Sequence, residues 1–180
     1  MQGRDKLLCE VDGVVLLRRA VLSLLDGGLA PVAVVLPPNG QLRRAALDGL
    51  GVQIVTVDDP ERGMGRSLAV GVAALGDDID AVAIMPGDMP RVRPESVRAL
   101  VEQFRATDKT IVCPTFEGKR GHPVLFDLPR HRAALSGLNE EEGGRGVLAR
   151  HADEVDFLPV NDAGVLLDVD TLAQLALANQ

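Results

Sequence analysis

Short apolar runs alternate with helical patterns along almost the whole chain, and this alternation limits the fold more than any other feature of the sequence. The runs end at turn-forming residues, and most are followed by a segment whose apolar residues recur at helical spacing. Strands joined through helices need crossover connections, which favour parallel pairing and helices on both faces of the sheet. We therefore expect an α/β fold with a doubly wound, mostly parallel sheet. The predicted strands are 31–36, 52–57, a run ending at Gly87, 110–114, 123–126, 155–160 and 165–167, and the predicted helices are 14–25, 41–50, 66–75, 94–105 and one from Thr171.

The size and composition fit one globular domain. The chain has 180 residues, of which 46% are hydrophobic, and it contains no repeat and no long linker, so we expect a single domain over 1–180. No apolar stretch approaches the roughly 20 residues that span a bilayer, and no signal-peptide pattern is visible. Cys9 and Cys113 lie far apart in apolar contexts, which favours buried thiols over a disulfide. These features predict a cytoplasmic protein.

The charge and the shortage of aromatic residues argue against a nucleic-acid binder. The formal net charge is −7, only 2% of the residues are aromatic, and Trp and Tyr are absent. Nucleic-acid binding favours basic patches and stacking rings. A small anionic ligand stays compatible with this composition, because local cations such as Lys6 and Arg66 decide its binding.

Asp88 is the first candidate site residue. It follows Gly87 directly after a buried apolar run, and so lies past the carboxyl end of a predicted strand. Open α/β sheets build their ligand sites there. Gly87 lets the backbone approach a ligand closely, and Pro90 stiffens the exit from the turn. A carboxylate in this place suits a hard cation such as magnesium. The alternative is an aspartate that only caps a turn.

Asp168 and Asp170 form a second carboxylate pair. In an extended segment their side chains point to the same side, because side chains alternate along a strand. Asp170 could instead be the N-cap of the last helix. Thr171 followed three residues later by Gln174 fits a capping box, however, and this would free Asp170 for a ligand.

Two glycine-containing segments could also contact a ligand. Residues 61–67 lie between a strand and a helix, where free N–H groups suit phosphate, although such loops are common without any ligand. Residues 118–123 place two cations and His122 between glycines at the entry to a strand, and the alternative there is an exposed hairpin tip. His122 has no second His or Cys at metal-ligand spacing. We expect His131 and His151 to lie on helix surfaces.

Five segments, taken in order, are similar to the nucleotidyltransferases that attach a nucleotide to molybdopterin. The sequence of residues 121–126 is most similar to that of the molybdenum cofactor cytidylyltransferases, and the resemblance extends from residue 2 to the end of the chain. It implies a nucleotide-diphospho-sugar-transferase-like, Rossmann-like fold. The segments are Gly3-Arg4-Asp5-Lys6-Leu7-Leu8, Gly63-Met64-Gly65-Arg66-Ser67-Leu68, Gly87-Asp88-Met89-Pro90, Arg120-Gly121-His122-Pro123-Val124 and Leu167-Asp168-Val169-Asp170-Thr171.

The resemblance implies a magnesium-dependent cytidylyltransferase. A phosphate oxygen of molybdopterin would attack the α-phosphate of CTP and expel pyrophosphate, with Mg²⁺ bridging the nucleotide phosphates and protein carboxylates. The implied protein partner is a molybdenum hydroxylase that receives the cytidine form of the cofactor. Asp88 would be the first metal ligand and Asp170 or Asp168 the second, while Lys6 would neutralise phosphate charge. The implied nucleotide-pocket residues are Gly63, Gly65, Ser67 and Gly87, and those facing the pterin are Gly121, His122 and Pro123.

The sequence departs from this family at its amino end. Family members begin with a strand and a glycine-rich loop that wraps the triphosphate, whereas Met1 stands where the family has the methionine before its Gly-Asp-Lys stretch. Without that strand we expect unpaired strand edges and an unfilled core. A late start, a truncated product and an inactive fold all account for this, and we favour the late start.

Three alternative functions stay open. They are a transferase for another nucleotide or acceptor, an impaired protein that only binds molybdopterin or nucleotide, and an oxidoreductase on the same scaffold.

Overall fold

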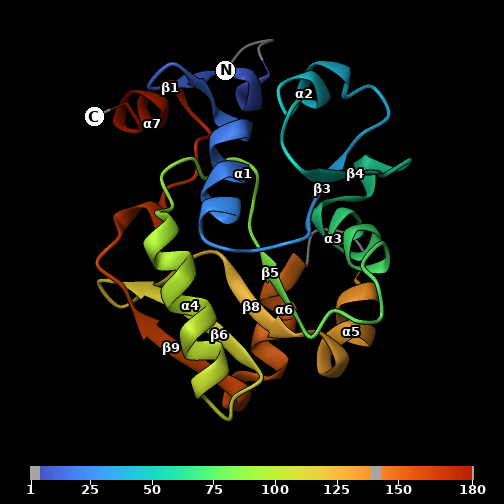
Figure 1. Ribbon diagram of the computed structural model, residues 1–180, viewed down its shortest axis with the longest axis vertical. Helices are drawn as coiled ribbons and strands as arrows, with labels where there is room; N and C mark the ends of the chain where they lie inside the picture. The colour runs from blue at the N-terminus through green and yellow to red at the C-terminus, as the bar shows by residue number, and fades with distance from the viewer. Residues whose placement is uncertain (1–4, 139–142, 180) are drawn as a thin grey trace.

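The structure is a computed structural model that describes residues 5–138 and 143–179, and it shows the expected α/β architecture (Figure 1). The α-helices are α1 Leu16–Asp26, α2 Gln41–Ala45, α3 Met64–Ala73, α4 Pro94–Ala106, α5 Leu128–Ser136, α6 Gly143–Arg150 and α7 Leu172–Leu177. The strands are β1 Glu10–Val11, β2 Val14–Val15, β3 Val32–Leu36, β4 Val52–Thr56, β5 Ala81–Ile84, β6 Ile111–Phe116, β7 Lys119–Arg120, β8 Val124–Asp127 and β9 Val155–Pro159. Short 3-10 turns are η1 Lys6–Leu8, η2 Pro60–Arg62, η4 Ala152–Glu154 and η5 Ala163–Leu166.

The main sheet has the order β5-β8-β6, with β7 and β9 also paired to β6. Strand β8 is antiparallel to both β5 and β6, while β9 is parallel to β6, so β5, β6 and β9 run in one direction. A second ladder joins β3 and β4 in parallel, from Val32↔Val52 to Leu36↔Thr56. The prediction of a mostly parallel sheet is therefore confirmed.

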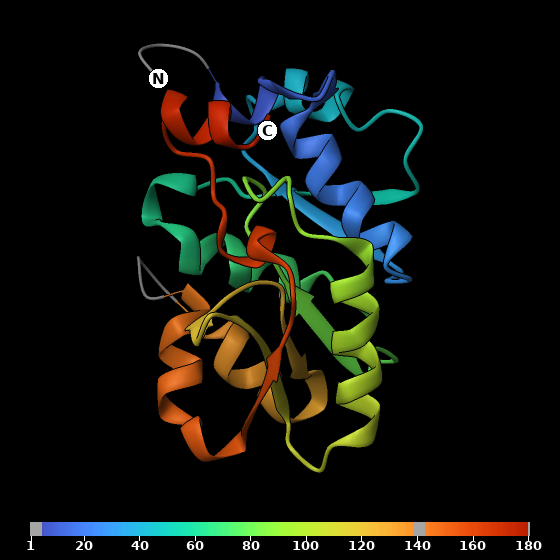
Figure 2. The same cartoon turned by 90° about the vertical axis from the view of Figure 1, so that its left-hand side faces the viewer.

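Both faces of the main sheet are covered, as expected for a doubly wound fold. Side chains alternate along β6: Ile111 packs into a cluster with residues of α3, α5 and α6, whereas Val112 packs with Leu100 of α4. Figure 2 shows α4 on one side of the sheet and α5 and α6 on the other. Pro94 opens α4 at its first turn, a position that suits proline because the N–H it lacks has no helical partner there.

Strands β3 and β5 each have one unpaired edge in the described part of the chain. Among those residues β3 pairs with β4 alone, and β5 pairs with β8 alone. All four residues of β5 are only partly buried, whereas Ile111 to Pro114 of β6 are buried.

The first and last described elements lie side by side. Helix α7 packs against the β1–β2 hairpin, where Val11, Val169 and Ala178 share one buried cluster (Figure 1). The Asp12 N–H donates to Asn179 Oδ1 at 2.9 Å. This packing brings the segment that begins at Asp5 next to the segment that ends at Thr171.

The structure corrects several predicted elements. Val14 and Val15 form a strand, not the start of a helix, because Asp12 and Gly13 adopt positive φ and turn the chain into a hairpin. Residues 165–167 are not a strand, since the Asp162 carboxylate caps η5 through the Gly164 N–H. Helix α2 ends at Ala45, earlier than predicted, and no bounds had been predicted for α5 and α6, although His131 was expected on a helix.

Side-chain burial corrects the prediction for His131, and of the two cysteines predicted to be buried it confirms Cys113. His131 was expected on a helix surface but is fully buried. Cys113 is buried and Cys9 is partly buried, and within the described residues no disulfide joins them. No helix in 5–138 or 143–179 combines the length and apolar character needed to cross a membrane.

Candidate functional site

Asp88 lies at the end of β5, as predicted, and is fixed there by close packing on both sides. A Cβ on Gly87 would come within 3.1 Å of Leu17 Cδ1, so the turn runs close to α1. The Val169 N–H donates to the Asp88 carbonyl oxygen at 3.0 Å. This backbone bond ties the turn after β5 to the segment that carries Asp168 and Asp170.

Lys6, Asp88 and Asp170 come together although they are distant in the sequence. The Lys6 ammonium donates to Asp88 Oδ2 at 2.7 Å and also to Asp170 Oδ1. The Asp88 side chain is 18% exposed and that of Asp170 is 57% exposed. We call these three residues the Lys6 cluster.

The charges in the Lys6 cluster shift two pKa values. Burial alone would lower the pKa of Lys6, but the hydrogen bonds and charges of Asp170 and Asp88 outweigh burial and raise it. The hydrogen bond from Lys6 lowers the pKa of Asp170, and the charge of Lys6 adds to this effect. Near neutral pH the cluster therefore contains a cationic Lys6 and an ionised Asp170.

Asp5 and Arg43 hold the segment that carries Lys6. The Asp5 carboxylate accepts from the Leu7 N–H at 3.1 Å and so caps η1. Arg43 of α2 donates to the same carboxylate through Nε at 2.7 Å and Nη2 at 3.1 Å. A pocket of about 180 Å³ lies beside this pair, lined by Asp5, Leu8, Pro37, Asn39, Gly40, Leu42 and Arg43. Sequence reasoning did not identify Asp5 and Arg43 as a pair, and the only signal was an aspartate before a helical turn.

Asp170 is not the N-cap of the last helix. The predicted capping box between Thr171 and Gln174 is present, with the Gln174 N–H donating to Thr171 Oγ1 at 3.2 Å and the Thr171 N–H donating to Gln174 Oε1 at 2.9 Å. Asp168 and Asp170 are both exposed while Val169 between them is buried, so the two carboxylates share one side. Asp168 also acts to lower the pKa of Asp170, after the larger effects of Lys6.

The segment 118–123 divides into an exposed part and a buried part. Lys119 and Arg120 lie on an exposed hairpin, and the Arg120 guanidinium stacks over Phe157 at 5.2 Å. Gly121 is buried so closely that a Cβ would come within 2.6 Å of the Val165 carbonyl oxygen. The hairpin-tip alternative thus holds for the two cations, while Gly121 and His122 turn inward.

His122 lies near Asp88. Its N–H donates to the Val165 carbonyl oxygen at 2.9 Å, and the pairing of Ile84 with Val124 places it beside the end of β5. Burial lowers the pKa of His122, so the imidazole is neutral near pH 7, and a hydrogen bond to the Ile84 backbone opposes this shift only in part. Its Nδ1 atom is buried and, within the described residues, has no hydrogen-bond partner. Pro123 follows through a cis peptide bond.

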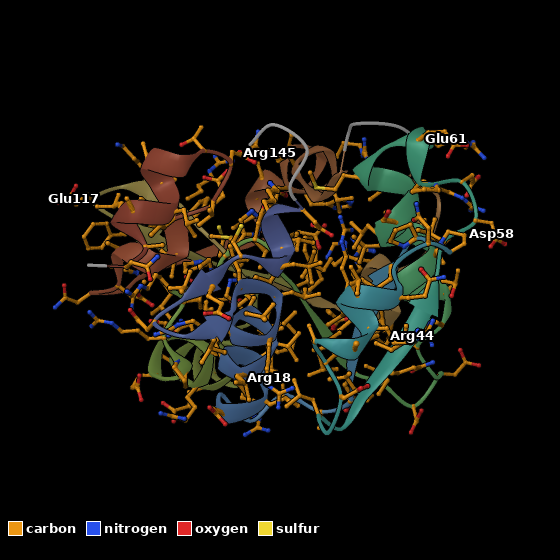
Figure 3. The ribbon with its side chains drawn as sticks, turned by 90° about the horizontal axis from the view of Figure 1, so that it is seen from above. Arg18, Arg44, Asp58, Glu61, Glu117 and Arg145 are labelled. Atoms are coloured by element: carbon orange, nitrogen blue, oxygen red, sulfur yellow. The ribbon has the colours of Figure 1, made fainter. Side chains whose placement is uncertain are left out.

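Gly63, Gly65 and Ser67 lie at the amino end of α3. Gly63 is the N-cap residue with φ of +93°, which favours glycine, and no side chain caps the helix there. Gly65 is buried and Ser67 is partly buried. Within residues 5–138 and 143–179, no hydrogen bond joins these three residues to the Lys6 cluster. In the view from above in Figure 3, Glu61 of η2 is on the right, Arg145 of α6 is near the middle, and Glu117 at the hairpin turn is on the left.

The Lys6 cluster fits a hard divalent cation only in part. Asp88 Oδ1 is buried and, in the described part of the chain, has no hydrogen-bond partner. That oxygen and the exposed Asp170 carboxylate are the ligand type that Mg²⁺ prefers. No group of three metal-binding side chains occurs among the described residues. The protein would thus supply two carboxylates, and substrate phosphates and water would complete the shell.

Comparisons with known proteins agree with this fold. The chain is 28% identical over 176 residues to nicotine blue oxidoreductase of Paenarthrobacter nicotinovorans, covering 94% of this chain and 85% of that protein. It is similar to the crystal structure of Rv0371c from Mycobacterium tuberculosis in complex with manganese, with 25% identity, a TM-score of 0.84, and coverage of 98% of this chain and 92% of that one.

A third comparison supports the fold alone. A nucleotidyl transferase from Methanothermobacter superposes with a TM-score of 0.82 at 20% identity, over 97% of this chain and 83% of that one. The model of the MobA-like NTP transferase domain matches residues 1–155, which is most of the sequence. The chain therefore belongs to the MobA-like NTP transferase domain family.

Proposed function

We propose that this nucleotidyltransferase moves CMP from CTP to the phosphate of molybdopterin and releases pyrophosphate. The observation that carries the proposal is the Lys6 cluster: two carboxylates and an ammonium converge just past the end of β5. Such an arrangement suits nucleotidyl transfer, in which positioning of the reactants and neutralisation of phosphate charge contribute more than covalent catalysis by the protein. In the transfer, an acceptor phosphate oxygen bonds to the α-phosphorus of CTP, and the bond from that phosphorus to the pyrophosphate oxygen breaks.

The residues of the Lys6 cluster have separate roles in the proposal. Asp88 and Asp170, with Asp168 beside them, hold a divalent cation, for which Mg²⁺ is the candidate. When bound, the cation neutralises phosphate charge and polarises the α-phosphate. The manganese in the complex of Rv0371c, a protein similar over almost the whole chain, supports the use of a divalent cation. Lys6 supplies a further positive charge to the phosphates.

The remaining residues are proposed to bind the two substrates. At the start of α3, the Gly65 N–H lies in the first helical turn, where backbone N–H groups have no helical partner and suit an anionic nucleotide, and Gly63 and Ser67 are proposed to line the same pocket. Gly87 lets the nucleotide approach the backbone beside Asp88. Gly121, His122 and Pro123 are proposed to face the pterin, because the buried Nδ1 of a neutral His122 can accept a hydrogen bond from a heterocycle. A molybdenum hydroxylase in the cytoplasm is the proposed recipient of the product.

An oxidoreductase is the second candidate. It is favoured by one specific observation, the similarity over 94% of the chain to nicotine blue oxidoreductase. This activity would need a redox cofactor, and the described residues show no feature that we can assign to one. A reductase would oxidise a reduced nicotinamide or flavin cofactor and would form no pyrophosphate.

One experiment separates these functions. The purified chain, with and without an N-terminal extension that supplies an apolar strand and a glycine-rich loop, is incubated with molybdopterin, Mg²⁺ and either CTP or GTP, and pyrophosphate is measured. We expect pyrophosphate with CTP and not with GTP, and a higher rate from the extended form. Asp88→Asn should abolish turnover, whereas Asp77→Asn, a change at a fully exposed carboxylate, should leave it unchanged. Absence of pyrophosphate from both forms despite ligand binding would contradict the transferase proposal, and oxidation of a reduced cofactor would favour the reductase.

A further inference from the structure

The Lys6 ammonium lies where a cation shared by Asp88 and Asp170 would lie. It contacts one carboxylate oxygen of each aspartate, at 2.7 Å for Asp88 Oδ2. A magnesium ion bound to the same oxygens would stand about 2.0–2.1 Å from each. An ammonium and a divalent ion cannot both occupy that space. The two cations therefore exclude each other at these two oxygens, while Asp88 Oδ1 is not held by Lys6.

The side chain of Lys6 has room to leave while its backbone stays in place. Lys6 is 32% exposed and Asp170 is 57% exposed, so one side of the contact faces solvent. Lysine carries its charge on a flexible four-carbon stem, which can move without a change in the backbone. The backbone of η1 is fixed separately by the Asp5 cap and its two hydrogen bonds from Arg43.

We propose that Lys6 is the internal counter-ion of the metal site, and that binding of a divalent cation displaces its ammonium from Asp88 and Asp170. This inference rests on the proposed function, because it takes Asp88 and Asp170 as the metal ligands. The displaced ammonium remains tethered beside the site. It is then free to pair with the anionic substrate. Lys6 thus pairs with the two carboxylates before the divalent cation binds and with the substrate phosphates afterwards.

The charge count at the site explains why the exchange matters. With Lys6 in place, the charge of Asp88 and Asp170 is neutralised by half, and the attraction for an incoming divalent ion is correspondingly weaker. Once the ion is bound, it neutralises both carboxylates, and the Lys6 charge is no longer required there. Lys6 should therefore weaken the binding of metal alone and favour its binding together with a polyphosphate.

Manganese titration tests the exchange without any turnover. Free Mn²⁺ is measured by electron paramagnetic resonance in the absence of nucleotide for the full chain and its variants. Lys6→Gln removes the competing charge, and we expect its Kd for Mn²⁺ to fall by about tenfold. Lys6→Arg keeps the charge, and Lys119→Gln removes a lysine from the exposed hairpin. Both should stay within about twofold of the unmodified chain, and circular dichroism confirms that each variant is folded.

A second readout follows the ammonium itself. The sequence contains only three lysines, Lys6, Lys109 and Lys119, so reductive methylation with ¹³C-formaldehyde labels three distinguishable side chains besides the terminal amine. We expect Mg²⁺ to shift the Lys6 resonance and to leave those of Lys109 and Lys119 in place. Asp88→Asn should abolish this shift.

The outcomes separate the exchange from the metal site. Equal or weaker Mn²⁺ binding by Lys6→Gln, with binding still lost in Asp88→Asn, would overturn the exchange and leave the proposed metal site standing. Binding that Asp88→Asn and Asp170→Asn do not affect would overturn the metal site and the exchange together.

Discussion

Asp162→Ala should destabilise the protein strongly, because this buried carboxylate joins two elements that have no other cap. Asp162 is 2% exposed. Its Oδ2 accepts from the Arg93 N–H at 2.9 Å and the Ser96 hydroxyl at 2.7 Å, and its Oδ1 accepts from the Gly164 N–H at 2.9 Å. The first two donors belong to the start of α4, which has no side-chain cap of its own. Asp162 is therefore a remote cap for α4 and a local cap for η5.

The magnitude follows from the number of stranded donors. Removing the carboxylate leaves three donors without a partner at about 1–1.5 kcal/mol each, so the free energy of unfolding should fall by about 4 kcal/mol. For a chain of this length, that loss lowers Tm by about 8–16 °C. Urea unfolding monitored by circular dichroism measures both quantities when combined with a thermal scan. The matched control is Asp77→Ala, at a fully exposed carboxylate, which should change stability by less than about 0.5 kcal/mol. A loss below about 1 kcal/mol for Asp162→Ala would refute this account of the cap.

Three further changes have defined outcomes. Gly121→Ala places a Cβ within 2.6 Å of the Val165 carbonyl oxygen, so unfolding in urea should show a loss of about 1–3 kcal/mol, and an unchanged midpoint would contradict this packing. Arg43→Gln removes both hydrogen bonds to Asp5, so pyrophosphate release should slow about tenfold while stability changes by less than about 1 kcal/mol; a full rate would show that η1 needs no such anchor. Burial lowers the pKa of His122 and His131 below 6.5, so their ¹⁵N NMR titration midpoints should lie below that value. Above pH 6.5 both imidazoles are unprotonated in the folded and in the unfolded protein, and their contribution to stability is complete. As the pH falls below 6.5 the unfolded chain takes up protons first, so this contribution to the free energy of unfolding is lost.

The strands were predictable where clear turn residues bound an apolar run. The run 31–36 ends at two prolines, and β3 is Val32–Leu36; the run 52–57 became β4 Val52–Thr56. The run 165–167 has the same apolar character but forms a 3-10 turn. The difference arises from Asp162, whose side chain captures the Gly164 N–H, and from the close contact of Gly164 with the Arg91 carbonyl oxygen. A local apolar pattern does not contain such a tertiary contact.

Burial of single side chains was harder to predict than element type. His131 has a polar side chain on a short amphipathic helix, and that pattern favoured the surface. In the structure its Nε2 meets Thr110 Oγ1 at 2.8 Å, and its ring packs against His151 at 4.8 Å between centroids. These partners come from the loop before β6 and from the end of α6. Which face of α5 is buried therefore depends on the tertiary positions of segments that are distant in sequence.

The Lys6 cluster could be anticipated as a set of residues, though not as a geometry. Asp88 and Asp170 follow from their places at an expected strand end and beside a capping box, and Lys6 was singled out only through the order of the five segments. The contacts that hold these residues were not predictable. The Asp5–Arg43 pair and the bond from the Val169 N–H to the Asp88 carbonyl oxygen join residues far apart in sequence, and each depends on the path of a loop.

The division of the strands into two ladders has a consequence for how the molecule opens. In the described residues β3 and β5 are joined to each other through helices and side chains, not through backbone hydrogen bonds. Along each of these strands, every second peptide group points away from its paired neighbour. Amide hydrogen exchange should therefore alternate between slow and fast residues along β3 and β5, whereas Ile111 and Val112 of β6, which pair on both sides, should both be protected. The β3–β4 ladder can then open as a separate unit, and with it the segment after β3, which contributes Pro37, Asn39 and Gly40 to the pocket beside Asp5 and Arg43.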